Sequence, residues 1–244
     1  LYYRDGWNQS DIATELNISR ATVSRLLQFG RDRGLVTIKI HNPVAPLHQL
    51  EVDLLAKYPS LHKIIIVPGT DDPLEEVGAA GAKYIEQVVE DKDIIGLGWG
   101  KTVYQVGLHL KPKDVTDITV VQMKGSMANT NTRNYAFETV NIFANAFNTV
   151  PQYLPLPVIF DHAKTRELVA NDTHIKHIMK LGEQSSIAVF TVGTVRDSAL
   201  LFKLGYFTKQ EQLTLQHEAV GDVFSRFIDS KGQIVNEDIN QRTI

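Results

Sequence analysis

The sequence contains no cysteine and no long apolar run. Without cysteine, a disulfide framework and a thiolate metal site are excluded, which fits a reducing compartment. No stretch approaches the roughly 18 consecutive apolar residues of a membrane helix, and no signal peptide is recognisable at the amino terminus. These absences predict a cytoplasmic protein without a membrane partner.

Both ends of the chain read as interrupted. The chain begins at Leu1 rather than at methionine and closes at Ile244 in an unfinished segment. We therefore expect the amino-terminal part of the first domain and the carboxyl-terminal part of the last domain to be missing. The 244 residues, 43% hydrophobic and 22% charged, suffice for one large globular domain and a smaller one.

Charge is unevenly distributed along the chain. The net charge is −3, yet residues 1–40 hold six Lys and Arg against four Asp and Glu, a surplus of +2 that leaves −5 for the remainder. A basic head on an acidic body indicates a head that meets a polyanion.

The head has the pattern of a helix-turn-helix. Apolar residues recur at helical spacing in residues 12–16 and again in residues 23–27. Between these runs, Asn17 tolerates a left-handed turn, and Ser19 is a suitable N-cap for the second helix. Residues 35–40 then alternate as a strand would, which predicts the wing of a winged domain.

Small polar and basic residues occupy the first turns of the second helix, the part of such motifs that enters the major groove. Their hydroxyl and guanidinium groups can bond phosphates and base edges, and Gln9 can touch the DNA backbone. A helical hairpin in an ordinary protein core is the plain alternative, but it does not explain these residue types. The predicted DNA-binding residues are Gln9, Ser19, Arg20, Ala21, Thr22, Ser24 and Arg25.

Two prolines, Pro43 and Pro46, predict a short stiff linker after the head. We expect a DNA-binding domain at residues 1–42, a linker and connecting helix at 43–58, and a larger domain at 59–244. In the larger domain, strands alternate with helices, which is typical of an α/β domain with a mainly parallel sheet. Strands are predicted at residues 63–67, 93–97, 118–122, 158–160 and 186–191, and helices at 47–58, 75–89, 101–110, 138–148, 163–170 and 173–181.

The loops that follow these strands are candidate sites, because ligands bind at the carboxyl ends of the strands in such sheets. The loop at residues 96–102, GLGWGKT, has glycines that let a ligand approach the backbone, and the helix after it directs free amides outward. The loop therefore suits a phosphate, although it lacks the spacing of a P-loop. A plain tight turn is the alternative.

A lysine follows the strand at residues 118–122, in the run VVQMKGSM. Lysines at strand ends are usually solvated or ion-paired. Beside apolar Val121 and Met123, and near another cation such as Lys101, the charged form of Lys124 would be disfavoured. A neutral amine can attack an aldehyde to form a Schiff base. From these residues alone, Lys124 is either a solvated charge or a nucleophile.

Two further loops carry groups suited to a sugar. Residues 190–195 place Gly193 and Thr194 after an apolar strand, and Asp222 stands beside a glycine turn where it can accept hydrogen bonds from hydroxyl groups. The histidines lack a carboxylate at ligand spacing, so neither a metal nor another cofactor is predicted.

Several motifs together resemble those of the SorC family of bacterial sugar-responsive transcriptional regulators, and within it the regulators of deoxyribonucleoside operons. These motifs are SDIATELNISRATVSRLL, GWGKT, VVQMKG, YLPLPVIFD, FTVGTVRD, GYFT and AVGDVFSRFID. The resemblance covers nearly the whole chain. It implies a winged helix-turn-helix head and a Rossmann-like effector domain similar to ribose-phosphate and glucosamine-phosphate isomerases. It also implies a homo-oligomer, a dimer or tetramer, on a palindromic operator.

The resemblance further implies an effector and its site. Deoxyribose 5-phosphate is the expected inducer, with its aldehyde bound to Lys124 as a Schiff base. Ser126 departs from the family pattern, because a second glycine usually follows the lysine at this place. The other expected effector- and phosphate-binding residues are Gly98, Trp99, Gly100, Lys101, Thr102, Gly125, Gly193, Thr194 and Asp222.

A repressor that the sugar phosphate releases from its operator is the main hypothesis. A lysine-dependent aldolase or isomerase would need a general acid and a general base, and these loops offer only Asp222, so we expect no enzymatic activity. A regulator that senses another sugar phosphate non-covalently also fits. A third hypothesis is a constitutive architectural DNA-binding protein. It is weaker because it gives no role to the large domain at 59–244 with its glycine-containing loops.

Overall fold

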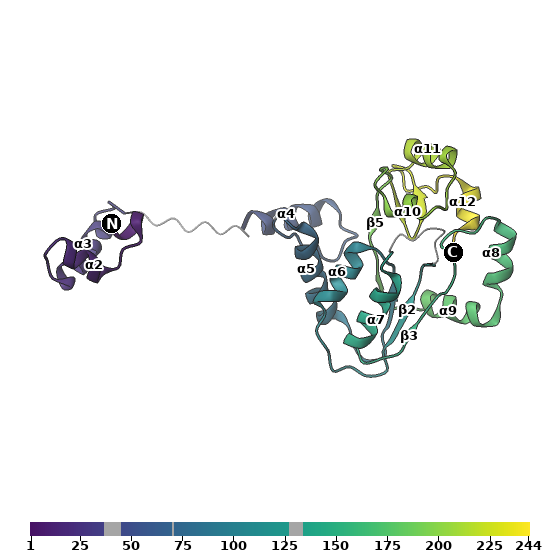
Figure 1. Ribbon diagram of the computed structural model, residues 1–244, viewed down its shortest axis with the longest axis horizontal. Coiled ribbons are helices and arrows are strands. Elements are labelled where there is room, and N and C mark those ends of the chain that lie inside the picture. Colours follow the sequence, from purple (N-terminus) through teal and green to yellow (C-terminus); the bar gives the residue numbers. More distant parts are fainter. Residues whose placement is uncertain (37–44, 70, 127–133) are drawn as a thin grey trace. The chain divides into compact units, whose positions relative to one another are not determined.

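The computed structural model describes residues 1–36, 45–69, 71–126 and 134–244. The chain divides into two compact units, unit 1 at Leu1–Leu50 and unit 2 at Glu51–Ile244, and each is described by itself (Figure 1). The division falls within helix α4 (Ala45–Lys57), the helix expected to connect the domains. The predicted domain boundaries at residues 42 and 58 stay predictions.

Unit 1 contains the helices α1 (Tyr2–Asp5), α2 (Gln9–Glu15) and α3 (Arg20–Asp32). The predicted turn between α2 and α3 is confirmed, because Asn17 adopts a φ of 51° there. The predicted N-cap is also confirmed, since Ser19 Oγ accepts a hydrogen bond from the Thr22 amide at 3.1 Å.

Only part of the apolar face predicted for unit 1 is buried. Ile12 and Val23 form its core, whereas Leu16 and Leu26 are 51% and 56% exposed because no described element covers them. The predicted wing falls largely outside the described residues; Leu35 and Val36 form a bend after α3. Residues 43 and 44 of the predicted linker also lie outside the described residues.

The main sheet of unit 2 has four parallel strands in the order β3-β2-β1-β4. Val120 in β2 and Ile95 in β1 are completely buried, because helices cover both faces of the sheet. This burial explains why the two strands read as continuous apolar runs. The strands are β1 (Ile94–Leu97), β2 (Thr119–Gln122), β3 (Pro151–Gln152) and β4 (Ile187–Val189).

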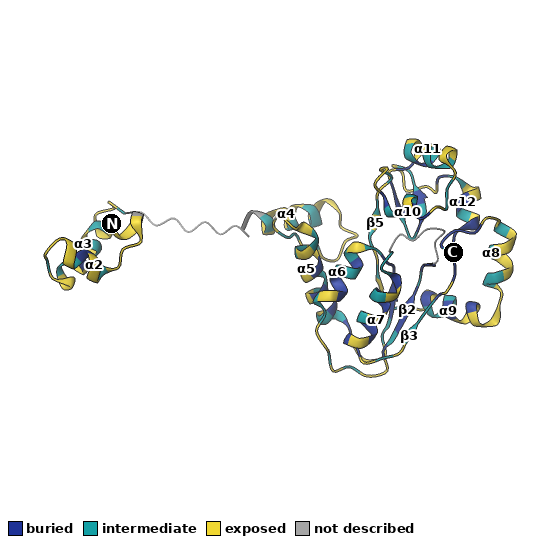
Figure 2. Ribbon diagram, in the orientation of Figure 1, coloured by how far each residue is buried: buried dark blue, intermediate teal, exposed yellow. Residues whose placement is uncertain are grey.

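The two faces of this sheet are covered by different helices. Ile95 and Val120 pack with side chains of α5, α6 and α7, whereas Val121 packs with Ile175 and Ile178 of α9 (Figures 1 and 2). The prediction of an α/β domain with a parallel sheet is confirmed. The helices of this part are α5 (Pro73–Val88), α6 (Lys101–His109), α7 (Ala136–Ala146), α8 (Ala163–Ala170) and α9 (Thr173–Glu183). No helix in the described ranges has both the length and the apolar character needed to cross a membrane.

A second, antiparallel sheet was not predicted. Its three strands lie in the order β5-β6-β7, and its core is shared with the helices that follow in the chain. Phe224 and Ser225 join β6 to β7 in a two-residue turn with φ values of 49° and 64°. The elements are β5 (Val192–Gly193), α10 (Leu200–Lys203), α11 (Lys209–Glu218), β6 (Gly221–Val223), β7 (Arg226–Ile228) and α12 (Glu237–Arg242).

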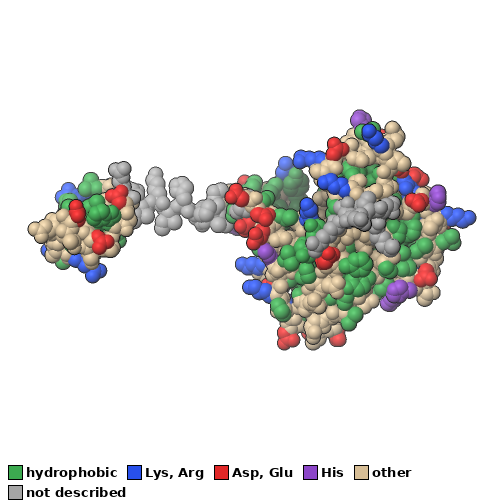
Figure 3. Space-filling view, in the orientation of Figure 1, with side chains coloured by type: hydrophobic (Ala, Val, Ile, Leu, Met, Phe, Trp, Pro, Cys, Tyr) green, Lys and Arg blue, Asp and Glu red, His purple; other side chains and the backbone are tan. Residues whose placement is uncertain are grey.

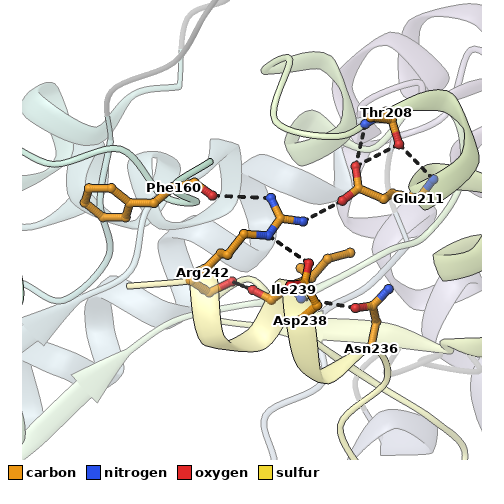
Figure 4. A network of polar contacts seen from close by, with 8 residues as sticks. Phe160, Thr208, Glu211, Asn236, Asp238, Ile239 and Arg242 are labelled. Atoms are coloured by element: carbon orange, nitrogen blue, oxygen red, sulfur yellow. Dashed lines mark hydrogen bonds and ion pairs between the residues drawn. The ribbon is translucent and has the colours of Figure 1, made fainter. Parts of the chain in front are cut away.

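A network around buried Arg242 ties this second sheet region to the main body of unit 2 (Figure 4). The guanidinium bonds Glu211 Oε1 at 2.5 Å, Asp238 Oδ2 at 3.1 Å and the carbonyl of Phe160 at 3.3 Å. Burial acts to raise the pKa of Glu211, but hydrogen bonds from Thr208 and Arg242 outweigh it and hold that pKa below its usual range.

Three predicted strands differ from the structure. Residues 63–67 form no strand; the Ile66 amide donates to Glu51 Oε1 at 2.7 Å instead of to a neighbouring strand. Residues 158–160 do not join the parallel sheet, because Ile159 forms an antiparallel bridge with Thr243. The strand predicted at 186–191 ends at Val189 as β4, and β5 begins in the other sheet. Of these three runs only residues 158–160 are buried; Ile65 is 44% exposed, and Ile187 and Val189 are half-buried. An apolar run therefore specified neither complete burial nor a pairing partner.

Candidate functional site

A cavity of about 330 Å³ lies where β1, β2 and β4 of unit 2 end. Its lining comes from the segments that follow these three strands, from α10 and from β6 with its turn. The structure therefore brings Lys124 together with every other expected effector residue except Gly125. This is the sheet edge at which α/β proteins bind their ligands.

One end of the cavity is the amino terminus of α6. Gly100 is the N-cap and has a φ of 145°, a conformation that only glycine adopts readily. No described side chain caps this end, so the first amides of the helix keep their hydrogen-bonding capacity. Lys101, which is exposed, and Thr102 begin the helix beside them. Amides, a hydroxyl and a cation are the groups that bind a phosphate.

Trp99 connects this loop to the segment that carries Lys124. Its indole Nε1 donates to the Gly125 carbonyl at 2.6 Å, and Lys124 Nζ lies 4.3 Å from the centre of its ring. Gly125 itself lies outside the cavity lining. A Cβ on Gly125 would come within 2.4 Å of the Pro157 carbonyl, so this glycine allows the two backbones to pack closely.

Gln122 supports the Lys124 backbone from inside the protein, a role that was not predicted from the sequence. Its buried side chain donates to the Lys124 carbonyl at 2.6 Å. Two residues after Lys124, the Ser126 amide donates a hydrogen bond to the Leu156 carbonyl at 2.8 Å. Residues 154–157, LPLP, therefore brace the segment after β2. A glutamine inside an apolar strand was the signal that could have revealed this support.

Lys124 is a buried amine in this cavity, with 8% of its surface exposed. Burial lowers the pKa of Lys124 to about 8, and the attraction of the Asp222 carboxylate acts in the opposite direction. The lowering has the predicted direction; of the two expected causes, apolar surroundings and repulsion from Lys101, only burial contributes. At a pKa of about 8, roughly a tenth of the amine is neutral at pH 7, far more than for an ordinary lysine.

Asp222 is the charge that faces Lys124. Burial raises the pKa of Asp222, while the attraction of Lys124 and the hydrogen bond from the Ser225 amide act to lower it. That amide lies 3.0 Å from Asp222 Oδ2. Gly193 is the residue opposite Asp222 in the antiparallel pair, and a Cβ added to it would come within 1.8 Å of Asp222 Oδ1. The glycine therefore provides the space that the carboxylate occupies.

Two phenylalanines that were not predicted as site residues form an apolar part of the lining. The rings of Phe190 and Phe224 are 5.0 Å apart at their centres, and both line the cavity. Phe224 has a φ of 49°, which is unusual for a bulky residue. No local signal predicts this, because the conformation follows from the β6–β7 turn.

The predicted DNA-binding residues lie together in unit 1, at the start of α3 and of α2. Gln9 and Thr22 are half-buried, and the hydroxyls of Ser19 and Thr22 lie 2.9 Å apart. The others project into solvent from the first turns of α3, namely Arg20, Ala21, Ser24 and Arg25. Nothing in unit 1 pairs the guanidiniums of Arg20 and Arg25 among the described residues.

The described residues contain no group of three or more His, Cys, Asp or Glu that could hold a metal ion. Charges of both signs are interspersed over the face of unit 2 shown in Figure 3. The ionisable side chains that line the cavity are Lys101, Lys124 and Asp222.

Comparisons with known proteins agree with this arrangement. A family model described as "Putative sugar-binding domain" matches residues 42–244. The deoxyribonucleoside regulator of Bacillus subtilis is 45% identical over 247 residues, covering 100% of this chain and 79% of its own length. Relatives of this kind are transcriptional regulators, which confirms that the protein is a regulator rather than an enzyme.

Solved structures share the fold. The full-length sorbitol operon regulator SorC of Klebsiella pneumoniae matches with a TM-score of 0.72 at 24% identity, over 100% of this chain and 80% of its own. A domain of a possible sugar-binding transcriptional regulator from Arthrobacter aurescens matches with a TM-score of 0.70 at 29% identity. The match covers 80% of this chain and 77% of the Arthrobacter chain. The chain belongs to the SorC family of sugar-binding transcriptional regulators.

Proposed function

We propose that this protein is a repressor whose unit 1 binds operator DNA and whose unit 2 binds deoxyribose 5-phosphate, which releases the DNA. The identity of 45% to the deoxyribonucleoside regulator of Bacillus subtilis supports this class of effector. The observation that carries the proposal is a buried lysine with a pKa of about 8 in the same cavity as an uncapped helix amino terminus.

Lys124 supplies the amine. Its neutral form attacks the aldehyde of the open-chain sugar, and loss of water gives a Schiff base. The Trp99 ring at 4.3 Å and the Asp222 carboxylate stabilise the positive charge of the iminium that results. The adduct is a sensor state rather than a step in turnover.

The start of α6 supplies the phosphate site. Its free amides and the hydroxyl of Thr102 donate hydrogen bonds to the phosphate oxygens, and Lys101 adds a positive charge. A sugar phosphate is thereby held at two points, its aldehyde carbon at Lys124 and its phosphate at α6. A free aldehyde without the phosphate has only the first of these contacts.

Unit 1 supplies the DNA contacts. Exposed Arg20, Ser24 and Arg25 on α3 contact bases and phosphates in the major groove, and two copies of the head in a homo-oligomer match a palindromic operator. The protein works in the cytoplasm. Release requires that the effector bind more tightly to the DNA-free arrangement than to the DNA-bound one, because only a difference in affinity shifts the equilibrium.

A fluorescence anisotropy titration tests the proposal. The operator fragment is selected from random DNA with the purified protein, and binding is measured with and without deoxyribose 5-phosphate. We expect the sugar phosphate to weaken operator binding, and ribitol 5-phosphate, which has no aldehyde, to have a smaller effect. Operator binding that is indifferent to millimolar deoxyribose 5-phosphate would refute the effector assignment.

The variant Lys124→Arg separates covalent from non-covalent sensing. Arginine retains the positive charge and much of the volume but forms no Schiff base at neutral pH. We expect K124R to bind the operator as the wild type does and to ignore deoxyribose 5-phosphate. If K124R still responds, the effector is sensed through its phosphate and hydroxyl groups alone.

A further inference from the structure

Asp222 supplies the single carboxylate of the cavity lining in the part of the chain that the structure describes. Its Oδ2 atom accepts the Ser225 amide at 3.0 Å, whereas no described residue donates a hydrogen bond to its Oδ1 atom. Oδ1 lies over the bare Cα of Gly193 and is held there by the β5–β6 pairing. One oxygen thus anchors the side chain, and the other is available for a proton.

Lys124 and Asp222 are the two buried ionisable groups of the cavity lining among the described residues, and Lys101 of the same lining is exposed. Both are buried, at 8% and 7% exposed, and they interact electrostatically across the cavity. Transfer of one proton from the ammonium to the carboxylate makes both groups neutral. Burial favours such a transfer, because the charged forms of both groups lose their hydration inside the protein.

We propose that Asp222 is the proton shuttle for Schiff-base formation at Lys124, a role that goes beyond holding a sugar hydroxyl and that rests on the proposed function. Schiff-base formation needs such a group twice. The ammonium must first lose a proton before its nitrogen can attack, and the hydroxyl of the carbinolamine must later gain a proton before it can leave.

The steps balance with Asp222 alone. The Lys124 ammonium gives one proton to the carboxylate through a water molecule or a sugar hydroxyl placed between them, because the two groups form no direct hydrogen bond or ion pair in the structure. The free amine forms a bond to the aldehyde carbon, and a proton moves from nitrogen to oxygen to give the neutral carbinolamine. The Asp222 acid then protonates the hydroxyl, the carbon–oxygen bond breaks, and the nitrogen lone pair forms the iminium. Water is the single by-product, and Asp222 ends as the carboxylate beside the new cation.

The other ionisable and polar groups of the cavity do not offer this chemistry. Lys101 is a cation and is expected to hold the phosphate. The hydroxyl groups of the lining are far too weak as acids and bases to exchange a proton at neutral pH; they belong to Thr102, Thr191, Thr194 and Ser198. Among the described residues of the lining, Asp222 is therefore the one group that can act in both directions.

A purely electrostatic role for Asp222 predicts the opposite experimental result. The Asp222 charge keeps the Lys124 pKa higher than burial alone would leave it. Its removal would leave more neutral amine at pH 7, and an amine limited only by its protonation would react faster. Loss of a shuttle instead makes the reaction slower. The direction of the change in rate therefore separates the two roles.

The test is a quenched-flow experiment with deoxyribose 5-phosphate, in which borohydride traps the adduct and intact mass reports its extent. We expect Asp222→Asn to trap the sugar about 100-fold more slowly than the wild type. The asparagine oxygen can still accept the Ser225 amide. Binding of inorganic phosphate, followed through Trp99 fluorescence in a Trp7→Phe background, checks that the D222N cavity is intact. Trapping by D222N at the wild-type rate or faster overturns the proposal.

The pH profile of the wild type gives a second reading that needs no variant. The active state holds one proton between Lys124 and Asp222, so the trapping rate should pass through a maximum, with its alkaline limb near the Lys124 pKa of about 8. A rate that climbs with pH to a plateau above that pKa contradicts the shuttle even if D222N fails to fold. A wild type that traps no sugar at any pH overturns the proposed covalent sensing itself.

Discussion

The carboxylate of Asp222 lies directly over Gly193, its partner on the neighbouring strand. A Cβ built on Gly193 would stand 1.8 Å from Asp222 Oδ1. The Asp222 carboxylate can therefore occupy its position only because Gly193 has no side chain. We expect Gly193→Ala to push the carboxylate away from Lys124 and to lower the stability of the protein by about 1–3 kcal/mol. Urea unfolding measures the stability, and borohydride trapping measures the site.

Gly69→Ala is the matched control for this substitution. No atom of the described residues beyond its chain neighbours lies within 4 Å of a Cβ added at Gly69, so the added methyl group meets none of them. We expect G69A to unfold and to trap the sugar as the wild type does. A G193A variant that equals G69A in both measurements would show that Asp222 is not held where the structure places it.

The pKa of Lys124 should fall further when Asp222 loses its charge. In the wild type, burial lowers the pKa to about 8 and the Asp222 charge acts against that fall. In D222N the burial remains and the attraction is lost, so the pKa should lie below the wild-type value. A ¹³C NMR titration of the Lys124 Cε atom, assigned with K124R, measures both values. A D222N pKa equal to or above that of the wild type would contradict the pairing.

The ion pair between Arg242 and Glu211 should stabilise unit 2 more than the ion pair between Arg242 and Asp238. The Glu211 side chain is 25% exposed and that of Asp238 is 76% exposed, so water screens the second pair far more. We expect Glu211→Gln to lower the free energy of unfolding by about 1–2 kcal/mol and Asp238→Asn to change it by less than about 1 kcal/mol. Urea titrations at pH 7 compare the two variants.

The same pair predicts a dependence on pH. The folded-state pKa of Glu211 lies below its usual value, so its contribution is fully present above the unfolded-state pKa. That contribution is lost as pH falls through the folded-state value. The stability difference between the wild type and E211Q should therefore shrink in acid. A difference that stays constant from neutral pH into strong acid would mean that the charge of Glu211 contributes nothing.

The guanidiniums at the start of α3 should dominate DNA binding. Arg20 and Arg25 are exposed on its first turns, whereas Arg33 follows the end of the helix and lies 5.3 Å from the Phe29 ring centre. We expect Arg20→Ala and Arg25→Ala to weaken operator binding. Each arginine that binds a phosphate should also, when removed, reduce the slope of log affinity against log salt concentration by about one. Arg33→Ala is the control and should bind as the wild type does. Equal losses in all three variants would assign DNA binding to another surface.

Three strands of the parallel sheet and most helices could be predicted from sequence because their signals are local, whereas the two-residue strand β3 was not predicted. Buried strands such as β1 and β2 are apolar runs, and α8 coincides with its predicted range. The antiparallel sheet could not be predicted, since β5, β6 and β7 contain three residues or fewer and are set by pairing across the chain. Residues 63–67 have the composition of a strand, but composition does not supply a pairing partner.

The site shows the same division. Lys124 and the glycine loop at residues 96–102 could be recognised, because each is a conspicuous residue type after an apolar strand. The supports of Lys124 could not, because the Gln122 side chain and the Trp99 indole act on backbone carbonyls that only the folded chain brings near. Lys124 and Asp222 are far apart in the chain. They line one cavity only because the parallel sheet and the antiparallel sheet both contribute to it.

Intact mass after borohydride reduction with deoxyribose 5-phosphate, followed by peptide mapping, tests the central claim most directly. The account predicts one reduced sugar phosphate per chain, located on Lys124, absent from K124R and prevented by excess inorganic phosphate that competes at α6. An unmodified wild-type chain, or an adduct on any lysine other than Lys124, would contradict it.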